Sequence, residues 1–154
     1  MAAYYLDTSA LIKGYVHELG SHWVQTILES DQKHELYTVH IAGAEFFAAL
    51  YRRLRDKNLS KPMTARLANR FRADLTALYS IVAVDDDLIN QAIDLIQKHP
   101  LRGYDAVHLA AALELHDFRQ RLQLSTLTFV SADGEQLNVA KAAGLQTENP
   151  NLYQ

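Results

Sequence analysis

Short runs of apolar residues alternate with longer amphipathic segments along the whole chain. The short runs are rich in β-branched and aromatic residues, which is typical of strands. In the longer segments apolar residues recur three and four positions apart, the spacing of a helix with one buried face. Strands are predicted at about residues 4–6, 36–39, 81–84 and 126–130, the third of them buried. Helices are predicted over about residues 10–12, 22–29, 41–55, 64–79, 88–99, 103–116 and 137–143.

Polar and helix-breaking residues set the expected boundaries of these elements. Thr8 or Ser9 can cap the first helix, and the acidic run that starts at Asp85 is interpreted as another N-cap with favourable first-turn charge. Pro62 favours a loop over residues 58–63. Gly144 suits the position just after the last helix, and only a weak tail is expected beyond it.

Strands that alternate with helices are typical of βαβ units, which form a parallel sheet covered by helices on both faces. The predicted fold class is α/β, a three-layer α/β/α sandwich with a central, mainly parallel sheet. The length of 154 residues favours a single domain over residues 1–154. No apolar run approaches the ~18 residues of a membrane helix, and no signal peptide is visible, so we expect a cytoplasmic protein.

Composition narrows the possible chemistry. The absence of cysteine excludes a disulfide scaffold, a zinc ribbon and a cysteine nucleophile. No Ser-His-Asp arrangement and no glycine-rich phosphate loop stands out. With 15 Lys and Arg against 18 Asp and Glu, the net charge is -3, which at first argues against a nucleic-acid partner.

Four acidic residues lie where elements begin or end. Asp7 and Asp133 each follow a predicted strand in a hydroxyl-bearing turn, and Glu45 and Asp105 lie near the starts of predicted helices. Parallel sheets bind ligands at the carboxyl ends of their strands, so all four can reach one crevice. Clustered carboxylates repel one another unless a cation neutralises them, and oxygen ligands suit Mg²⁺ or Mn²⁺. Each residue taken alone also fits a helix cap, a solvated helix face or a strand end.

The residues around these carboxylates resemble the PIN-domain family, and VapC-type toxins above all. The likeness is carried by LDTSALIK at 6–13, AE at 44–45, RGYDAVHLAAA at 102–112, FVSAD at 129–133 and AGL at 143–145. It runs in order from about Tyr4 to Leu145. The resemblance implies a metal-dependent endoribonuclease that hydrolyses RNA phosphodiester bonds with water activated by Mg²⁺ or Mn²⁺. It also implies a homodimer that a cognate antitoxin protein neutralises.

The resemblance assigns the four carboxylates to the active site, and each of them has an expected role there. Asp7 and Asp105 are expected to be the principal metal ligands. Glu45 is expected to complete the ligand set or to orient the water, and Asp133 to hold a second ion or a bridging water. Asp133 occupies the least constant acidic position of the family. Supporting hydrogen bonds are expected from the hydroxyls of Thr8, Ser9 and Ser131.

Positive charge is concentrated in one segment. Residues 52–72 hold eight basic residues and one acid, a local charge of +7, and the rest of the chain sums to -10. A basic helical hairpin beside an acidic pocket can steer RNA phosphates towards metal ions. The alternative is a solvated face above an apolar stripe that contains Leu67 and Phe71. The candidate RNA-binding residues are Arg52, Arg53, Arg55, Lys57, Arg66 and Arg70.

Two other functions stay open. One is a catalytically inactive binding module with the same fold, and the other is a nuclease for DNA or for a particular nucleic-acid structure with the same acidic site. His108 lies three residues after Asp105 on the same helix face and can assist, but a hydrogen-bonded packing role is the expectation.

Overall fold

The computed structural model describes residues 1–154 and contains one five-stranded sheet. All neighbouring strands are parallel, in the order β3-β2-β1-β4-β5. The predicted α/β fold with a parallel central sheet is therefore confirmed. The strands are β1 (Ala3–Leu6), β2 (Glu35–Val39), β3 (Tyr79–Val82), β4 (Leu127–Val130) and β5 (Gln146–Glu148).

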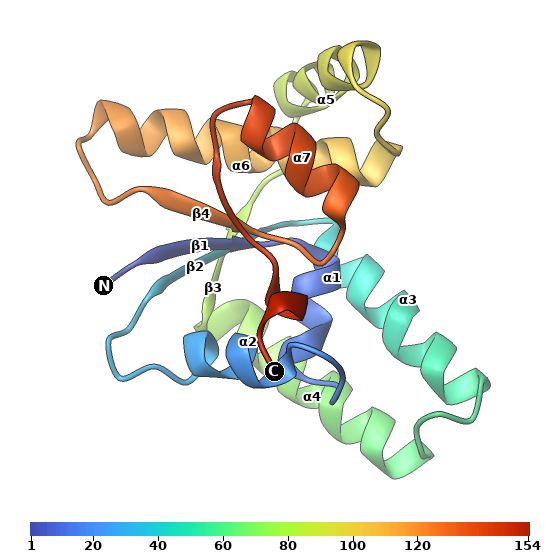
Figure 1. Ribbon diagram of the computed structural model, residues 1–154. Coiled ribbons are helices and arrows are strands. Elements are labelled where there is room, and N and C mark those ends of the chain that lie inside the picture. The colour runs from blue at the N-terminus through green and yellow to red at the C-terminus, as the bar shows by residue number, and fades with distance from the viewer.

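Helices form a layer on each side of the sheet (Figure 1). Helices α5, α6 and α7 lie over one face, α2 and α4 lie over the other, and α3 pairs with α4 in a projecting hairpin. No helix is both long enough and apolar enough to cross a membrane. The helices are α1 (Thr8–Leu11), η1 (Ile12–Gly14), α2 (Ser21–Leu28), α3 (Ala42–Arg55), α4 (Lys61–Ala77), α5 (Asp86–Lys98), α6 (Gly103–Arg121), α7 (Gly134–Ala142) and η2 (Pro150–Leu152).

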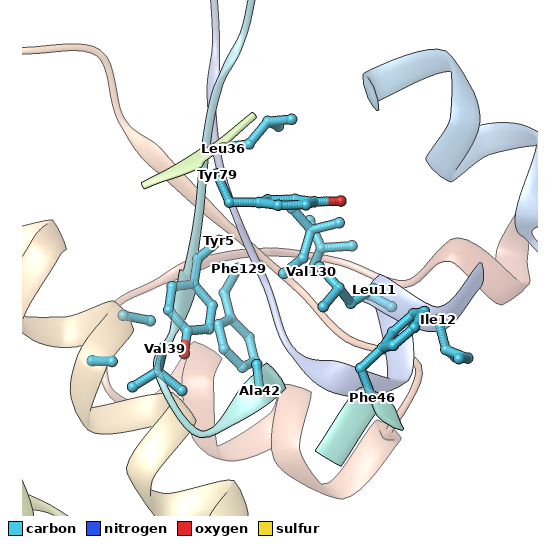
Figure 2. Packing of buried hydrophobic residues seen from close by; sticks show 14 of the residues in the cluster. Tyr5, Leu11, Ile12, Leu36, Val39, Ala42, Phe46, Tyr79, Phe129 and Val130 are labelled. Atoms are coloured by element: carbon cyan, nitrogen blue, oxygen red, sulfur yellow. The ribbon is translucent and has the colours of Figure 1, made fainter. Parts of the chain in front are cut away.

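Strand alternation divides the core between the two faces of the sheet. Tyr5 and Phe129 are paired in register, stack at a ring-centroid distance of 5.6 Å and lie side by side in Figure 2. The opposite face carries Tyr79, which packs against Phe71 of α4, and Phe71 in turn stacks on Phe46 of α3. These aromatic contacts attach the base of the α3–α4 hairpin to the sheet.

Two boundaries around α4 differ from the sequence prediction. The loop expected over residues 58–63 is shorter, because α4 begins at Lys61. Ser60 caps this helix by accepting the backbone N–H of Met63 at 3.2 Å, and Pro62 lies in the first turn, where its missing N–H is not needed. The predicted buried strand at residues 81–84 lies two residues earlier, in β3, an edge strand whose Ser80 and Ile81 are exposed.

The C-terminal region contains one strand that the sequence pattern does not reveal. Strand β5 has only three residues, all of them polar, and it is formed by parallel pairing with β4 at the edge of the sheet. Gly144 precedes it with φ 98°, which confirms its predicted position after the last helix. The tail beyond β5 is partly ordered by η2, whose N-cap Asn149 accepts the N–H of Asn151.

The order of the strands fixes where a ligand site is expected. From β1 the chain moves outward to β2 and β3, and then returns to place β4 on the other side of β1. The connections therefore reverse direction between β1 and β4. Such a switch point leaves a crevice beyond the carboxyl ends of the two strands. Asp7 follows β1 and Asp133 comes three residues after β4, so both flank this crevice.

Candidate active site

Asp7 is a buried carboxylate that three hydrogen bonds hold in place. Its Oδ1 accepts the hydroxyl of Ser9 at 2.7 Å and the backbone N–H of Ala10 at 3.0 Å. Its Oδ2 accepts the hydroxyl of Ser131 at 2.6 Å. Asp7 is thus the N-cap of α1, and the prediction that Thr8 or Ser9 caps this helix is wrong. Burial raises the pKa of the Asp7 carboxyl above its ordinary value, although these hydrogen bonds favour the charged form.

The two hydroxyl-bearing turns that look alike in the sequence are joined in the structure. Besides holding Asp7, Ser9 accepts the backbone N–H of Ala132 at 2.9 Å, and Ser131 accepts that of Asp133 at 3.0 Å. Each serine therefore bonds both to Asp7 and to the turn that follows β4. This arrangement fixes the carboxylate at the switch point of the sheet.

Glu45 lies in the first turns of α3 and is held by residues from two other elements. Thr8 donates its hydroxyl to Oε1 of Glu45 at 2.9 Å, and Nε2 of His108 lies 2.7 Å from the same oxygen. Burial alone raises the pKa of Glu45, but the hydrogen bonds from His108 and Thr8 outweigh it and bring the pKa below its ordinary value. His108 is only 1% exposed, so its predicted hydrogen-bonded packing role is confirmed.

Asp105 lies in the first turn of α6 and is partly exposed. Its nearest cation is the exposed guanidinium of Arg102, whose Nε lies 3.6 Å from Oδ2. Burial raises the pKa of Asp105, and the negative charges of Asp133 and Asp7 raise it further. Asp105 is therefore close enough to both of these aspartates for their charges to repel its own.

Asp133 caps α7, as the simpler interpretation of this residue proposed. Its Oδ1 accepts the backbone N–H groups of Glu135 at 3.0 Å and Gln136 at 3.3 Å. The buried side chain of Gln136 then donates to the backbone oxygen of Asp105 at 3.1 Å. A helix cap and a hydrogen bond between helices thus hold α7 beside the start of α6.

The arrangement fits a hard divalent cation in its chemistry, but the four carboxylates do not form one closed cluster. No three acidic or histidine side chains lie close enough together to bind a single ion. The available donors are all oxygens, and the repulsion that raises the pKa of Asp105 is what a cation relieves. Oδ2 of Asp7 accepts one hydrogen bond and Oε2 of Glu45 accepts none, so both oxygens keep a lone pair.

The six basic candidates of the hairpin fall into two groups. Arg53 donates to Oε2 of Glu18 at 3.0 Å and to the backbone oxygen of Ala49 at 3.1 Å. Arg70 lies 3.5 Å from Glu29, 3.9 Å from Asp74 and over the ring of Tyr15. The other four are exposed and form no ion pair, namely Arg52, Arg55, Lys57 and Arg66. Of the six candidates, only these four present a free positive charge to solvent.

Two residues near the site were not singled out for this role by the sequence. Tyr5 places its hydroxyl 2.9 Å from Nδ1 of His108. Tyr5 and Asp7 are two positions apart, so the alternation of side chains along a strand places them on the same face of the sheet. This spacing was the one feature of the sequence that could have pointed to Tyr5. The second residue is Gln136, whose bond to the start of α6 depends on packing that the sequence does not encode locally.

Comparison with known proteins identifies the family. Residues 4–142 match the family model for the PIN domain. The chain therefore belongs to the PIN domain family, as its motifs indicated. No curated protein matches the sequence.

Solved structures of bacterial proteins share the fold at low sequence identity. VapC20 from Mycobacterium tuberculosis, a sarcin-ricin loop cleaving toxin, is 17% identical with a TM-score of 0.63, over 93% of this chain and 96% of that one. FitAcB from Neisseria gonorrhoeae is 16% identical with a TM-score of 0.62, over 96% and 97%. VapBC2 from Rickettsia felis, bound to a DNA fragment from its promoter, is 14% identical with a TM-score of 0.62, over 97% and 98%.

Proposed function

We propose that this protein is a metal-dependent endoribonuclease of the VapC toxin type, which hydrolyses RNA phosphodiester bonds with Mg²⁺ or Mn²⁺. The observation that carries the proposal is Asp7, a carboxylate buried at the switch point and fixed by three hydrogen bonds, whose charge adds to burial and to the charge of Asp133 in raising the pKa of Asp105. The helix caps that Asp7 and Asp133 form do not account for Asp105, whose carboxylate has only the exposed Arg102 as an ionic partner.

The side chains divide the work in the proposed reaction. A divalent cation, when bound, would supply a water molecule of lowered pKa and offset charge on the scissile phosphate. Asp7 and Asp105 would hold it, and Asp133 would support a second ion or a bridging water. Glu45 would orient the attacking water with its unbonded Oε2. Ser9 and Ser131 keep Asp7 in one orientation, and Thr8 does the same for Glu45.

The α3–α4 hairpin supplies the proposed RNA-binding surface. Arg52, Arg55, Lys57 and Arg66 are exposed and have no acidic partner, so they are free to pair with phosphates. Arg53 and Arg70, which were also candidates, already have acidic partners within the protein. The proposed surface is therefore narrower than the basic segment of the sequence.

A protein antitoxin and a second copy of this chain are the proposed partners. Similar structures include VapBC-1 from Haemophilus influenzae and a toxin-antitoxin complex from Klebsiella pneumoniae. Light scattering of the purified protein measures the homodimer, and co-expression with the protein of the adjacent reading frame measures the antitoxin complex.

Incubation with total RNA in Mg²⁺, in Mn²⁺ or in EDTA tests the central proposal. Cleavage in either metal, its loss in EDTA and its loss in Asp7→Asn are the expected results. Parallel reactions contain single-stranded and double-stranded DNA of matched length. Preferential DNA cleavage favours the alternative nuclease, whereas no cleavage of any substrate by correctly folded protein favours the inactive binding module. Cleavage that persists in EDTA contradicts the proposed chemistry.

A further inference from the structure

His108 connects the centre of the sheet to one carboxylate of the proposed active site. It lies on α6, one helical turn after Asp105, and is almost completely buried. Its Nε2 is 2.7 Å from Oε1 of Glu45, and its Nδ1 is 2.9 Å from the hydroxyl of Tyr5 in β1. Both ring nitrogens of His108 therefore form hydrogen bonds, one to Glu45 and the other to Tyr5.

Hydrogen bonding determines which nitrogen of a neutral His108 carries the hydrogen. A neutral imidazole has one donor and one acceptor nitrogen. Oε1 of Glu45 is a carboxylate oxygen that can only accept, and it lies 2.7 Å from Nε2, so the hydrogen of the ring lies on Nε2 and is donated to Glu45. Nδ1 is then the acceptor and takes the hydroxyl hydrogen of Tyr5 at 2.9 Å. The opposite tautomer would set the lone pair of Nε2 against a carboxylate oxygen.

The two donors to Glu45 act on the same oxygen. Oε1 accepts both Nε2–H of His108 and the hydroxyl of Thr8, whose oxygen also lies 3.2 Å from Nε2. A carboxylate with two donors on one oxygen cannot rotate freely about its terminal bond. The second oxygen, Oε2, is consequently kept free and in a fixed position.

We propose that His108 is a positioning residue for Glu45 and that Tyr5 holds His108 in the tautomer and ring orientation that this role needs. Resting on the proposed function, the inference assigns Oε2 of Glu45 as the oxygen that serves the divalent cation or its water. His108 itself touches neither RNA nor the cation. Partners that orient a ligand in this way typically change metal affinity or activity by about 10–100-fold when they are replaced.

Mn²⁺ affinity tests the inference without any need for catalysis. Binding is followed by the electron paramagnetic resonance signal of free Mn²⁺ in wild-type protein and four variants. His108→Leu should weaken binding about tenfold, and Tyr5→Phe should weaken it about threefold. His108→Gln, whose amide keeps a donor for Glu45, should stay within about threefold of wild type. Tyr4→Phe is the matched control, because the neighbouring Tyr4 packs on the other face of the sheet against Trp23 and forms no hydroxyl hydrogen bond to the site.

Two further measurements separate positioning from general damage to the fold. Long-range ¹H–¹⁵N spectra of wild-type protein, assigned with His108→Gln, should show hydrogen on Nε2 and none on Nδ1. RNA cleavage by Tyr5→Phe and His108→Leu should lose kcat with little change in KM, because the RNA-binding arginines lie elsewhere. If His108→Leu does not fold, Tyr5→Phe and His108→Gln still carry the test.

The outcomes distinguish this inference from the proposed function. Hydrogen on Nδ1 in the wild type, or equal Mn²⁺ affinity in wild type, Tyr5→Phe and His108→Leu, overturns the inference alone. Wild-type protein that binds Mn²⁺ but leaves RNA intact overturns the proposed function alone. Absence of Mn²⁺ binding by the wild type overturns both.

Discussion

The two ends of helix α3 are built on different principles. At its start, Glu45 is held by Thr8 from α1 and His108 from α6. At its end, Arg52 and Arg55 are exposed and have no ion pair. The same helix therefore carries a carboxylate that residues from two other helices hold in place and two arginines that are surrounded by solvent.

This difference indicates how each end contributes to function. A metal ligand must be held within a fraction of an ångström, so the loss of one carboxylate or of one supporting donor has a large effect. Exposed cations act on RNA through their summed field, so each can be replaced at a small cost. We therefore expect large effects on catalysis at the acidic end and small, additive effects on binding at the basic end.

Removal of one carboxylate charge should produce the largest effect. Asp105→Asn is expected to lower the rate of RNA cleavage at least about 100-fold, because a direct ligand matters more than the supporting groups that cost 10–100-fold. The fold should be retained, since the Asp105 side chain accepts no backbone hydrogen bond. Initial rates in Mg²⁺ and circular dichroism measure the two quantities.

Asp117→Asn is the matched control for this variant. Asp117 is exposed on the same helix α6 and has no ion pair, so its substitution should leave the cleavage rate unchanged. If the Asp105→Asn protein keeps more than about a tenth of the wild-type cleavage rate, catalysis does not depend on Asp105 as a metal ligand.

Loss of three exposed cations should have a smaller effect, and it should change KM rather than kcat. The combined variant Arg52→Gln, Arg55→Gln and Arg66→Gln is expected to raise KM for RNA about tenfold and to leave kcat unchanged. Each lost phosphate contact should reduce the slope of log affinity against log salt by about 0.7 for single-stranded RNA. Steady-state kinetics at several salt concentrations measure both effects.

A second triple variant controls for overall charge. Lys98→Gln, Arg121→Gln and Lys141→Gln remove the same charge from exposed positions on α5, α6 and α7. KM should change little in this protein. Equal increases of KM in both triple variants would mean that the hairpin has no special role and that only the net charge matters.

The burial of Asp7 and Asp105, together with the repulsion that acts on Asp105, should appear as a moderate dependence of stability on pH. The pKa values of Asp7 and Asp105 are raised in the folded protein, so the folded state holds these protons more tightly than the unfolded state. Their contribution to the free energy of unfolding therefore falls as the pH rises from the ordinary Asp value of 3.8 through the higher folded values. Glu45, with its lowered pKa, acts in the opposite direction.

Comparison of variants isolates the contribution of Asp105. Without metal at neutral pH, Asp105→Asn should raise Tm relative to wild type, by about 2–4 °C for each kcal/mol of charge burial and repulsion that it removes. The difference should shrink as the pH falls and wild-type Asp105 becomes protonated. Thermal unfolding at a series of pH values measures it, and a lower Tm for Asp105→Asn at neutral pH would contradict the predicted repulsion.

The sequence predicts the fold well where a strand is buried on both faces of the sheet. Strands β1 and β4 are apolar and buried, and their predicted positions are nearly correct. The prediction is wrong for β3 because an edge strand has exposed positions that mimic a loop, and it misses β5 because that strand is short and polar. Pairing with a neighbour, rather than local pattern, creates these two strands.

The sequence also locates the acidic residues but not the contacts between them. Asp7 and Asp105 are found from their motifs, whereas the bond from Ser131 to Asp7 spans 124 positions and that from His108 to Glu45 spans 63. Such contacts depend on the order of strands and on helix packing. The same limit applies to the arginines, because Arg52 and Arg53 are indistinguishable by composition and differ only in what surrounds them.

The neighbouring residues Arg52 and Arg53 give the smallest and sharpest comparison. Arg53 bonds to Glu18, which also accepts Nζ of the buried Lys13 at 3.1 Å, so this arginine belongs to a network that attaches α3 to the segment after η1. Arg53→Gln should lower the free energy of unfolding by about 1 kcal/mol, which is the upper end of the range measured for exposed ion pairs. It should leave KM for RNA within about twofold of wild type. Denaturant titration and cleavage kinetics on the same preparation measure both quantities.

Arg52→Gln should give the opposite result, with KM raised about two- to threefold and the free energy of unfolding unchanged, because its guanidinium has no partner to lose. Its loss removes one cation from the proposed RNA-binding surface and nothing from the protein interior. If both variants raise KM equally at unchanged stability, Arg53 leaves Glu18 to bind RNA and the ion pair does not hold it. If both lower stability alone, the basic end of α3 serves the fold and RNA is bound elsewhere.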